Sequence, residues 1–205
     1  ALSGAGVFVE DKLFATLDPT TRDVNFPNGT RALVSDTVGF IRNLPHQLVA
    51  AFRATLEEVK SADVLVHVID AGNPSWVEQE ETVDRVLAEL GAADKPTIMA
   101  FNKMDEVEEP ELLRHLAARY PHVVFLAAKK GRGIIELEDM ITAVLRERWQ
   151  PVDAVLPLTA GDLVAELHAR GEVETEEYEG TAVHLAGKAP ADLAARIAWR
   201  AERGR

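Results

Sequence analysis

The stretch PTIMAFNKMD, from Pro96 to Asp105, decides the fold of this chain. Pro96–Asn102 is an apolar run of strand length that ends in a polar side chain. A strand without polar alternation is typical of a parallel sheet that is covered on both faces. The motif Asn102-Lys103-Met104-Asp105 therefore follows the carboxyl end of a buried strand, which is where such sheets bind ligands.

The same pattern continues on both sides of this stretch. Val64–Asp70 and Val123–Ala128 are two further apolar runs that predict buried strands. Helical stripes separate the runs, and the last stripe predicts a helix that ends near Gln150. Residues 1–150 are therefore predicted to form an α/β domain, a mostly parallel sheet with helices on both faces. The apolar positions of the four predicted helices are Leu48, Phe52, Leu56 and Val59; Val83, Val86, Leu87 and Leu90; Leu112, Leu113, Leu116 and Tyr120; and Leu137, Met140, Ile141, Val144 and Leu145.

A hairpin is predicted before the first apolar run. Asn28-Gly29 is the preferred pair for a tight turn, and it joins Arg22–Phe26 to Arg31–Asp36. The second strand ends in Asp36, so we expect this carboxylate at the same sheet edge as Asp70 and Asn102.

Residues 151–205 are predicted to form a second, small α+β domain. Strands are expected at 154–158, 172–178 and 182–186, and helices at 161–170 and 191–203. Five glutamates gather on the middle strand, and a solvated edge strand explains them better than a metal site does. They are Glu172, Glu174, Glu176, Glu177 and Glu179.

Composition narrows the function classes. The formal net charge of −12 argues against a generic basic face for DNA or an anionic membrane. The chain has no cysteine, which excludes disulfides, zinc–thiolate sites and thiol nucleophiles within it. No apolar run is long enough to span a bilayer and no leader peptide is visible, so we expect the cytoplasm. The six histidines show no metal-ligand spacing, and His67 within its apolar run is interpreted as a core residue.

The motif after the central strand has the chemistry to recognise a base. Guanine presents two parallel N–H donors, and one fixed carboxylate at Asp105 can accept both. Adenine lacks this donor pair and would leave the carboxylate unpaired. Asn102 can bond the other base edge, and the methylene stem of Lys103 can lie over the ring. In Ala127-Ala128-Lys129, a backbone N–H at the end of the third strand can reach the guanine O6.

Two further motifs suit a bound phosphate. In Asp36-Thr37-Val38-Gly39, the aspartate can hold Mg²⁺ through a water, and the backbone N–H of Gly39 can approach a γ-phosphate. In Phe14–Thr21, the hydroxyl of Thr16 can close on the same Mg²⁺. The alternative, that these threonines are ordinary loop residues, stays open and applies more strongly to Thr20 and Thr21.

These motifs together resemble the HflX family of ribosome-associated GTPases, within the Obg–HflX group of translation-factor-like GTPases. The resemblance covers nearly all of 1–150 and, less specifically, 151–205. It rests on FATLDPTTR at 14–22, DTVGFIRNLPHQ at 36–47, FRATLEEV at 52–59 and NKMD at 102–105.

The resemblance implies a Ras-like P-loop GTPase domain that binds GTP or GDP with Mg²⁺. It also implies binding to the rRNA and protein of the large ribosomal subunit, and splitting or rescue of stalled ribosomes. Thr16 then corresponds to the switch I magnesium threonine, and Asp36 and Gly39 to the switch II pair. The base readers are Asn102, Lys103 and Asp105, and the contacts of the last loop are Ala127, Ala128 and Lys129.

The sequence also departs from the family pattern. Ala127 stands where serine is usual, and Phe40 stands where Ras-like GTPases have a water-orienting glutamine, so we expect slow hydrolysis without a partner. The phosphate-binding loop GxxxxGK[ST] is absent from these 205 residues, as is the family's N-terminal domain. We therefore expect this form to bind nucleotide feebly or not at all, and an N-terminally extended form to bind GTP and GDP. An inert fragment, or a pseudo-GTPase that serves as a ribosome or protein interaction module, is the open alternative.

The missing segment has a predicted structural consequence. A central strand of the sheet normally precedes the phosphate loop in this fold. Without it, we expect exposed apolar surface and an unpaired strand edge.

Overall fold

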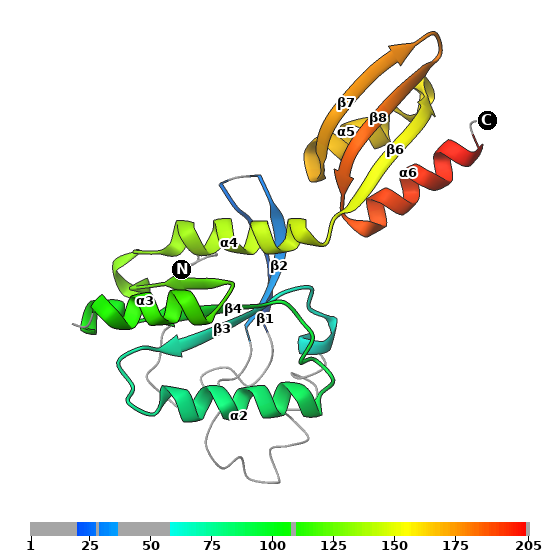
Figure 1. The fold of residues 1–205 in the computed structure, drawn as a ribbon. Coiled ribbons are helices and arrows are strands. Elements are labelled where there is room, and N and C mark those ends of the chain that lie inside the picture. Colours follow the sequence, from blue (N-terminus) through cyan, green and yellow to red (C-terminus); the bar gives the residue numbers. More distant parts are fainter. Residues whose placement is uncertain (1–19, 28, 37–57, 108–109, 204–205) are drawn as a thin grey trace. The chain divides into compact units, whose positions relative to one another are not determined.

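A computed structural model describes residues 20–27, 29–36, 58–107 and 110–203 of the chain. The chain divides into two compact units (Figure 1). The first reaches to Ile141, and the second comprises Thr142–Arg205 together with Pro27–Arg31. Within the described ranges, no helix has both the length and the apolar character that a membrane crossing requires.

The first unit contains the predicted parallel sheet. Strands β3 (Leu65–Asp70), β4 (Thr97–Asn102) and β5 (Val123–Phe125) lie in the order β3-β4-β5, and both pairings are parallel. Asp70 and Asn102 are direct partners at the end of the β3–β4 ladder. The predicted edge of polar side chains therefore exists at these two strands.

Helices connect the strands, as the apolar stripes predict. Helix α2 (Trp76–Glu89) follows β3, α3 (Pro110–Arg119) follows β4, and α4 (Ile134–Glu147) follows β5. Figure 1 shows α2 and α4 on opposite sides of the sheet. Parallel strands need such crossovers, so the alternation of strands and helices follows from the sheet type.

The central strand β4 carries the core of this unit on both faces. Phe101 is fully buried, and its ring meets Trp76 of α2 edge-on with the centroids 5.3 Å apart. Leu116 of α3 packs in the same cluster. On the opposite face of the strand, Ile98 and Ala100 are also fully buried. Burial of this kind holds the end of β4, and hence Asn102, in a fixed position.

Among the described strands, β3 pairs with β4 alone, and its Val68 exposes 59% of its surface. The unpaired edge that the sequence predicts stays a prediction for the whole chain. His67 on the same strand is half-buried, and burial lowers the pKa of its imidazole. His67 is therefore less buried than its interpretation as a core residue implies.

Two predicted carboxyl ends lie three residues too far along the chain. The third strand ends at Phe125 instead of Ala128, because Ala127 exchanges backbone hydrogen bonds of 3.1 and 3.3 Å with Arg132 and turns the chain out of the sheet. The fourth helix ends at Glu147, and Gln150 begins the next strand. Pro151 accounts for the extended backbone of Gln150, because a proline disfavours helical backbone in the residue before it.

The predicted hairpin forms a sheet of its own. Strands β1 (Thr20–Asn25) and β2 (Arg31–Asp36) pair with each other, and Gly29 of the turn has φ 84°. Within the described strands no ladder joins β2 to β3, so the predicted shared sheet edge does not include Asp36. The predicted helix after Pro45 lies outside the described residues except for its last turn, where Val59 is buried.

The second unit is the small α+β structure that the sequence predicts. Its antiparallel sheet has the order β6-β8-β7, and both helices pack their apolar side chains into one core. Strand β6 begins four residues before the predicted range 154–158 and ends one residue earlier, whereas β7 and β8 extend one and three residues beyond their predicted carboxyl ends. The elements are β6 (Gln150–Pro157), α5 (Gly161–Arg170), β7 (Glu172–Glu179), β8 (Ala182–Ala189) and α6 (Ala191–Arg203).

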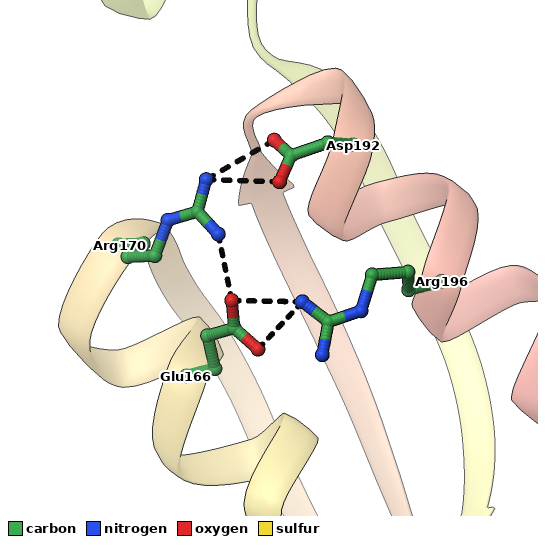
Figure 2. A network of polar contacts seen from close by, with 4 residues as sticks. All are labelled: Glu166, Arg170, Asp192 and Arg196. Atoms are coloured by element: carbon green, nitrogen blue, oxygen red, sulfur yellow. Dashed lines mark hydrogen bonds and ion pairs between the residues drawn. The ribbon is translucent and has the colours of Figure 1, made fainter.

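Charged side chains join the two helices of this unit at the surface. Glu166 of α5 accepts hydrogen bonds from Arg170 at 2.6 Å and from Arg196 of α6, and Arg170 also binds Asp192 (Figure 2). The two guanidinium groups lower the pKa of Glu166. The network links α5 to α6 at the surface, above the buried core of this unit. Because exposed ion pairs contribute little to stability, its contribution to the free energy of unfolding is modest.

The acidic strand β7 is an edge strand of its sheet, as predicted. One of its glutamates, Glu176, accepts hydrogen bonds from Tyr178 at 2.6 Å and pairs with His168 at 2.7 Å. No group of three or more acidic, histidine or cysteine side chains suited to a metal occurs among the residues that the structure describes.

Candidate nucleotide-binding site

The carboxyl end of β4 turns sharply into the motif that the sequence singles out. Lys103 adopts a left-handed backbone with φ 62°, and Met104–Glu106 then form a short 3-10 turn, η1. Lys103 is the single non-glycine residue with positive φ in the described ranges. Such a conformation costs about 1–2 kcal/mol and is concentrated at functional sites. The Met104 N–H donates to the carbonyl of Leu126 at 2.9 Å, which holds the turn beside the neighbouring loop.

Asn102 joins the two loops that the sequence assigned to base recognition. Its Oδ1 accepts the backbone N–H of Ala128 at 3.1 Å, across 26 residues of sequence. Ala128–Lys130 form a second 3-10 turn, η2, directly after β5. The Ala128 N–H that we expect to face the guanine O6 is thus donated to Asn102 here, and a bound base has to share or replace this bond.

Asp105 carries the carboxylate that is predicted to accept the two guanine donors. Its Oδ2 lies 2.8 Å from Nζ of Lys130, on η2. The hydrogen bond from Lys130 lowers the pKa of Asp105, and the charge of Arg132 acts in the same direction. The group is therefore an ionised acceptor at neutral pH, which is the state that base recognition requires.

Lys103 is held by a carboxylate at the end of the adjacent strand. Its Nζ lies 2.7 Å from Oδ2 of Asp70, and Oδ1 of the same carboxylate accepts the N–H of Gly72 at 3.1 Å. With the ammonium group fixed in this way, the methylene stem of Lys103 has a defined direction. Its predicted place over the base ring stays a prediction.

The remaining predicted site residues divide into two groups. Thr16, Gly39 and Phe40 lie outside the described residues. Asp36 is described, ends β2 and is exposed, so its carboxylate is accessible to a hydrated cation. Lys129 is exposed on η2, whereas the adjacent Ala127 is buried with 5% of its surface accessible.

Sequence reasoning missed two residues at this site. Asp70 was recognised as a strand-end acid, but its pairing with Lys103 depends on the residue-by-residue register of β3 and β4. Lys130 was not singled out. Lys130 directly follows Ala127-Ala128-Lys129, in a loop that we expected beside Asp105, and this position was the one indication in the sequence that it could contact Asp105.

These features define the class of protein. The fold is that of P-loop GTPases, whose solved structures match this one. A crystal structure of SsGBP in complex with GDP aligns with 62% of this chain and 42% of its own, at TM-score 0.52 and 30% sequence identity. The structure of Era with MgGDPNP and nucleotides 1506-1542 of 16S ribosomal RNA aligns with 66% of this chain and 47% of its own, at TM-score 0.54. Because its sequence identity is 21%, that likeness shows the fold alone.

Sequence comparisons then give the family. The model of the 50S ribosome-binding GTPase family matches residues 1–103. The protein GTPase HflX of Magnetococcus marinus is 44% identical over 94% of this chain and 44% of its own length. GTPase HflX of Lacrimispora saccharolytica is 38% identical over 98% of this chain and 47% of its own. The chain belongs to the 50S ribosome-binding GTPase family, as an HflX-type member, and it spans about half the length of these relatives.

Proposed function

We propose that residues 1–150 belong to a domain that binds GTP and GDP, and that 151–205 form a separate small domain beside it. One observation carries this proposal: Asp105 stands ionised on the turn after β4, next to the loop that Asn102 ties to Ala128. A carboxylate in that place selects guanine by its paired N–H donors and disfavours adenine.

The phosphate end of the nucleotide is proposed to meet Asp36, Gly39 and Thr16. Asp36 provides an accessible oxygen ligand, the type that Mg²⁺ prefers, either directly or through water. Mg²⁺ would neutralise charge that develops on the phosphates during hydrolysis. The Gly39 N–H would bind the γ-phosphate, and Thr16 would close when that phosphate is present.

For the full-length protein we propose GTP hydrolysis coupled to the large ribosomal subunit, with splitting or rescue of stalled ribosomes in the cytoplasm. The match to the 50S ribosome-binding GTPase family and to the HflX proteins supports this assignment. Phe40 offers no group that polarises water, so hydrolysis is expected to be slow until the ribosome completes the site.

Competition against a fluorescent guanine nucleotide tests the proposal. GTP and GDP should displace the probe from the full-length gene product at concentrations far below those needed for ATP. Adding large ribosomal subunits should accelerate phosphate release and leave that preference unchanged. Equal competition by ATP would refute base recognition. Ribosome binding without any nucleotide binding would instead favour the interaction module.

A further inference from the structure

Lys130 contributes a cation to the base-binding loops from outside the recognised motifs. Its Nζ is 2.8 Å from Oδ2 of Asp105, while the lysine side chain remains 56% exposed and the aspartate side chain 21% exposed. The pair joins η1 to η2 through side chains, beside the link from Asn102 to Ala128.

The structure separates the roles of the two lysines at this edge. Lys103, the lysine of the motif, is committed to Asp70 at 2.7 Å. Lys130 serves the carboxylate of Asp105. Asp70 and Asp105 thus each have an ammonium group beside them, and the one beside Asp105 comes from outside the motif.

The ion pair leaves room for a base. An ionised carboxylate has two oxygens with about four lone-pair positions. Lys130 uses one position on Oδ2, so acceptor capacity remains on both oxygens for two base donors. A carboxylate rotates about its terminal torsion with little restriction. A hydrogen bond from a fixed donor to one oxygen therefore restricts the directions in which the other oxygen can point.

We propose that Lys130 is a positioning residue for guanine recognition, which fixes the Asp105 carboxylate from η2 in the orientation that accepts both base donors. This inference rests on the proposed guanine-binding function. A purely structural role does not explain the pair equally well, since exposed ion pairs contribute little to stability. The effect of Lys130 should therefore appear in base selectivity.

The test compares Lys130→Met with the matched control Arg132→Met in the full-length gene product. Both variants remove one exposed cation from the loop after β5, and the charge of each cation acts on Asp105. GDP, IDP and ADP are titrated against each variant; IDP carries hypoxanthine, which keeps the N1–H donor and lacks the exocyclic amine. Lys130→Met should weaken GDP binding about two- to fivefold, the range expected for one exposed ion pair, and should weaken IDP binding less. Lys130→Arg should restore most of the GDP affinity, because it keeps the charge and the donors.

The outcomes separate this inference from the proposed function. If the wild-type protein binds ADP as well as GDP, base recognition itself fails, and the role of Lys130 fails with it. If the wild-type protein prefers GDP but Lys130→Met keeps the wild-type ratio of GDP to IDP affinity, or changes it no more than Arg132→Met does, the proposed function stands and the role of Lys130 is refuted.

Discussion

Two glycines in the loop after β5 provide a test of how rigidly the base site is built. Gly131 and Gly133 have nearly the same backbone conformation, with φ 68° and 77°. Their surroundings differ. A Cβ on Gly131 would meet no atom within 4 Å, whereas a Cβ on Gly133 would overlap the carbonyl oxygen of Phe125 and lie 3.2 Å from Cα of Leu126.

The expected magnitudes follow from this difference. Gly131→Ala adds the cost of a left-handed backbone at a residue with a side chain, about 1–2 kcal/mol of unfolding free energy. Gly133→Ala adds the same cost together with a clash against backbone of β5, for which overpacked positions suggest about 1–3 kcal/mol more. Relief of the clash requires the loop to move, which displaces Ala128 and the Lys130–Asp105 pair.

Urea unfolding measures both variants. In a background with Trp149→Phe and Trp199→Phe, the remaining Trp76 packs against Phe101 and reports on the core of the first unit. Gly133→Ala should lower the transition midpoint clearly more than Gly131→Ala, with similar slopes. It should also weaken GDP binding by the full-length gene product more strongly. Equal losses of stability in the two variants would refute the steric reasoning.

Two other side chains give independent predictions. Tyr120→Phe should lower the unfolding free energy by about 1.5–3 kcal/mol in urea titrations, because its hydroxyl donates at 2.6 Å to the buried carboxylate of Glu80. The control Tyr178→Phe removes an exposed bond of the same length and should change stability little, so equal losses would contradict the role of burial. Burial lowers the pKa of the His67 imidazole, although the nearby carboxylates of Asp84 and Glu80 act in the opposite direction. As the pH falls below about 6.5, the imidazole therefore binds a proton in the unfolded chain before it does so in the folded protein, and the free energy of unfolding decreases. His67→Gln should flatten the dependence of stability on pH between about 5 and 7, and an unchanged slope, or the same flattening in the exposed control His115→Gln, would refute this assignment.

Much of the fold was predictable because it depends on local patterns. Apolar runs without alternation predict buried parallel strands, and β4 matches its run within one residue. The ends of β5 and α4 were not predictable from periodicity. Ala127 leaves the sheet through backbone bonds to Arg132, and no apolar pattern encodes such a turn.

The candidate site was predictable in part for the same reason. The motif at 102–105 is contiguous, so its place at a strand end follows from the strand that precedes it. The pair Lys103–Asp70 spans 33 residues and needs the β3–β4 register, and the pair Lys130–Asp105 needs the relative positions of η1 and η2. Contacts of this type are set by tertiary structure, which sequence spacing alone does not determine.

The most direct test of the central claim is the nucleotide preference of Asp105→Asn in the full-length gene product. An asparagine in this place can accept one hydrogen bond and donate another, which suits xanthine, with its carbonyl at C2, better than guanine with its amine there. We predict that XDP binding rises and GDP binding falls, with the ratio of the two affinities changing more than about tenfold. If Asp105→Asn keeps the wild-type preference for GDP over XDP, this carboxylate does not read the base.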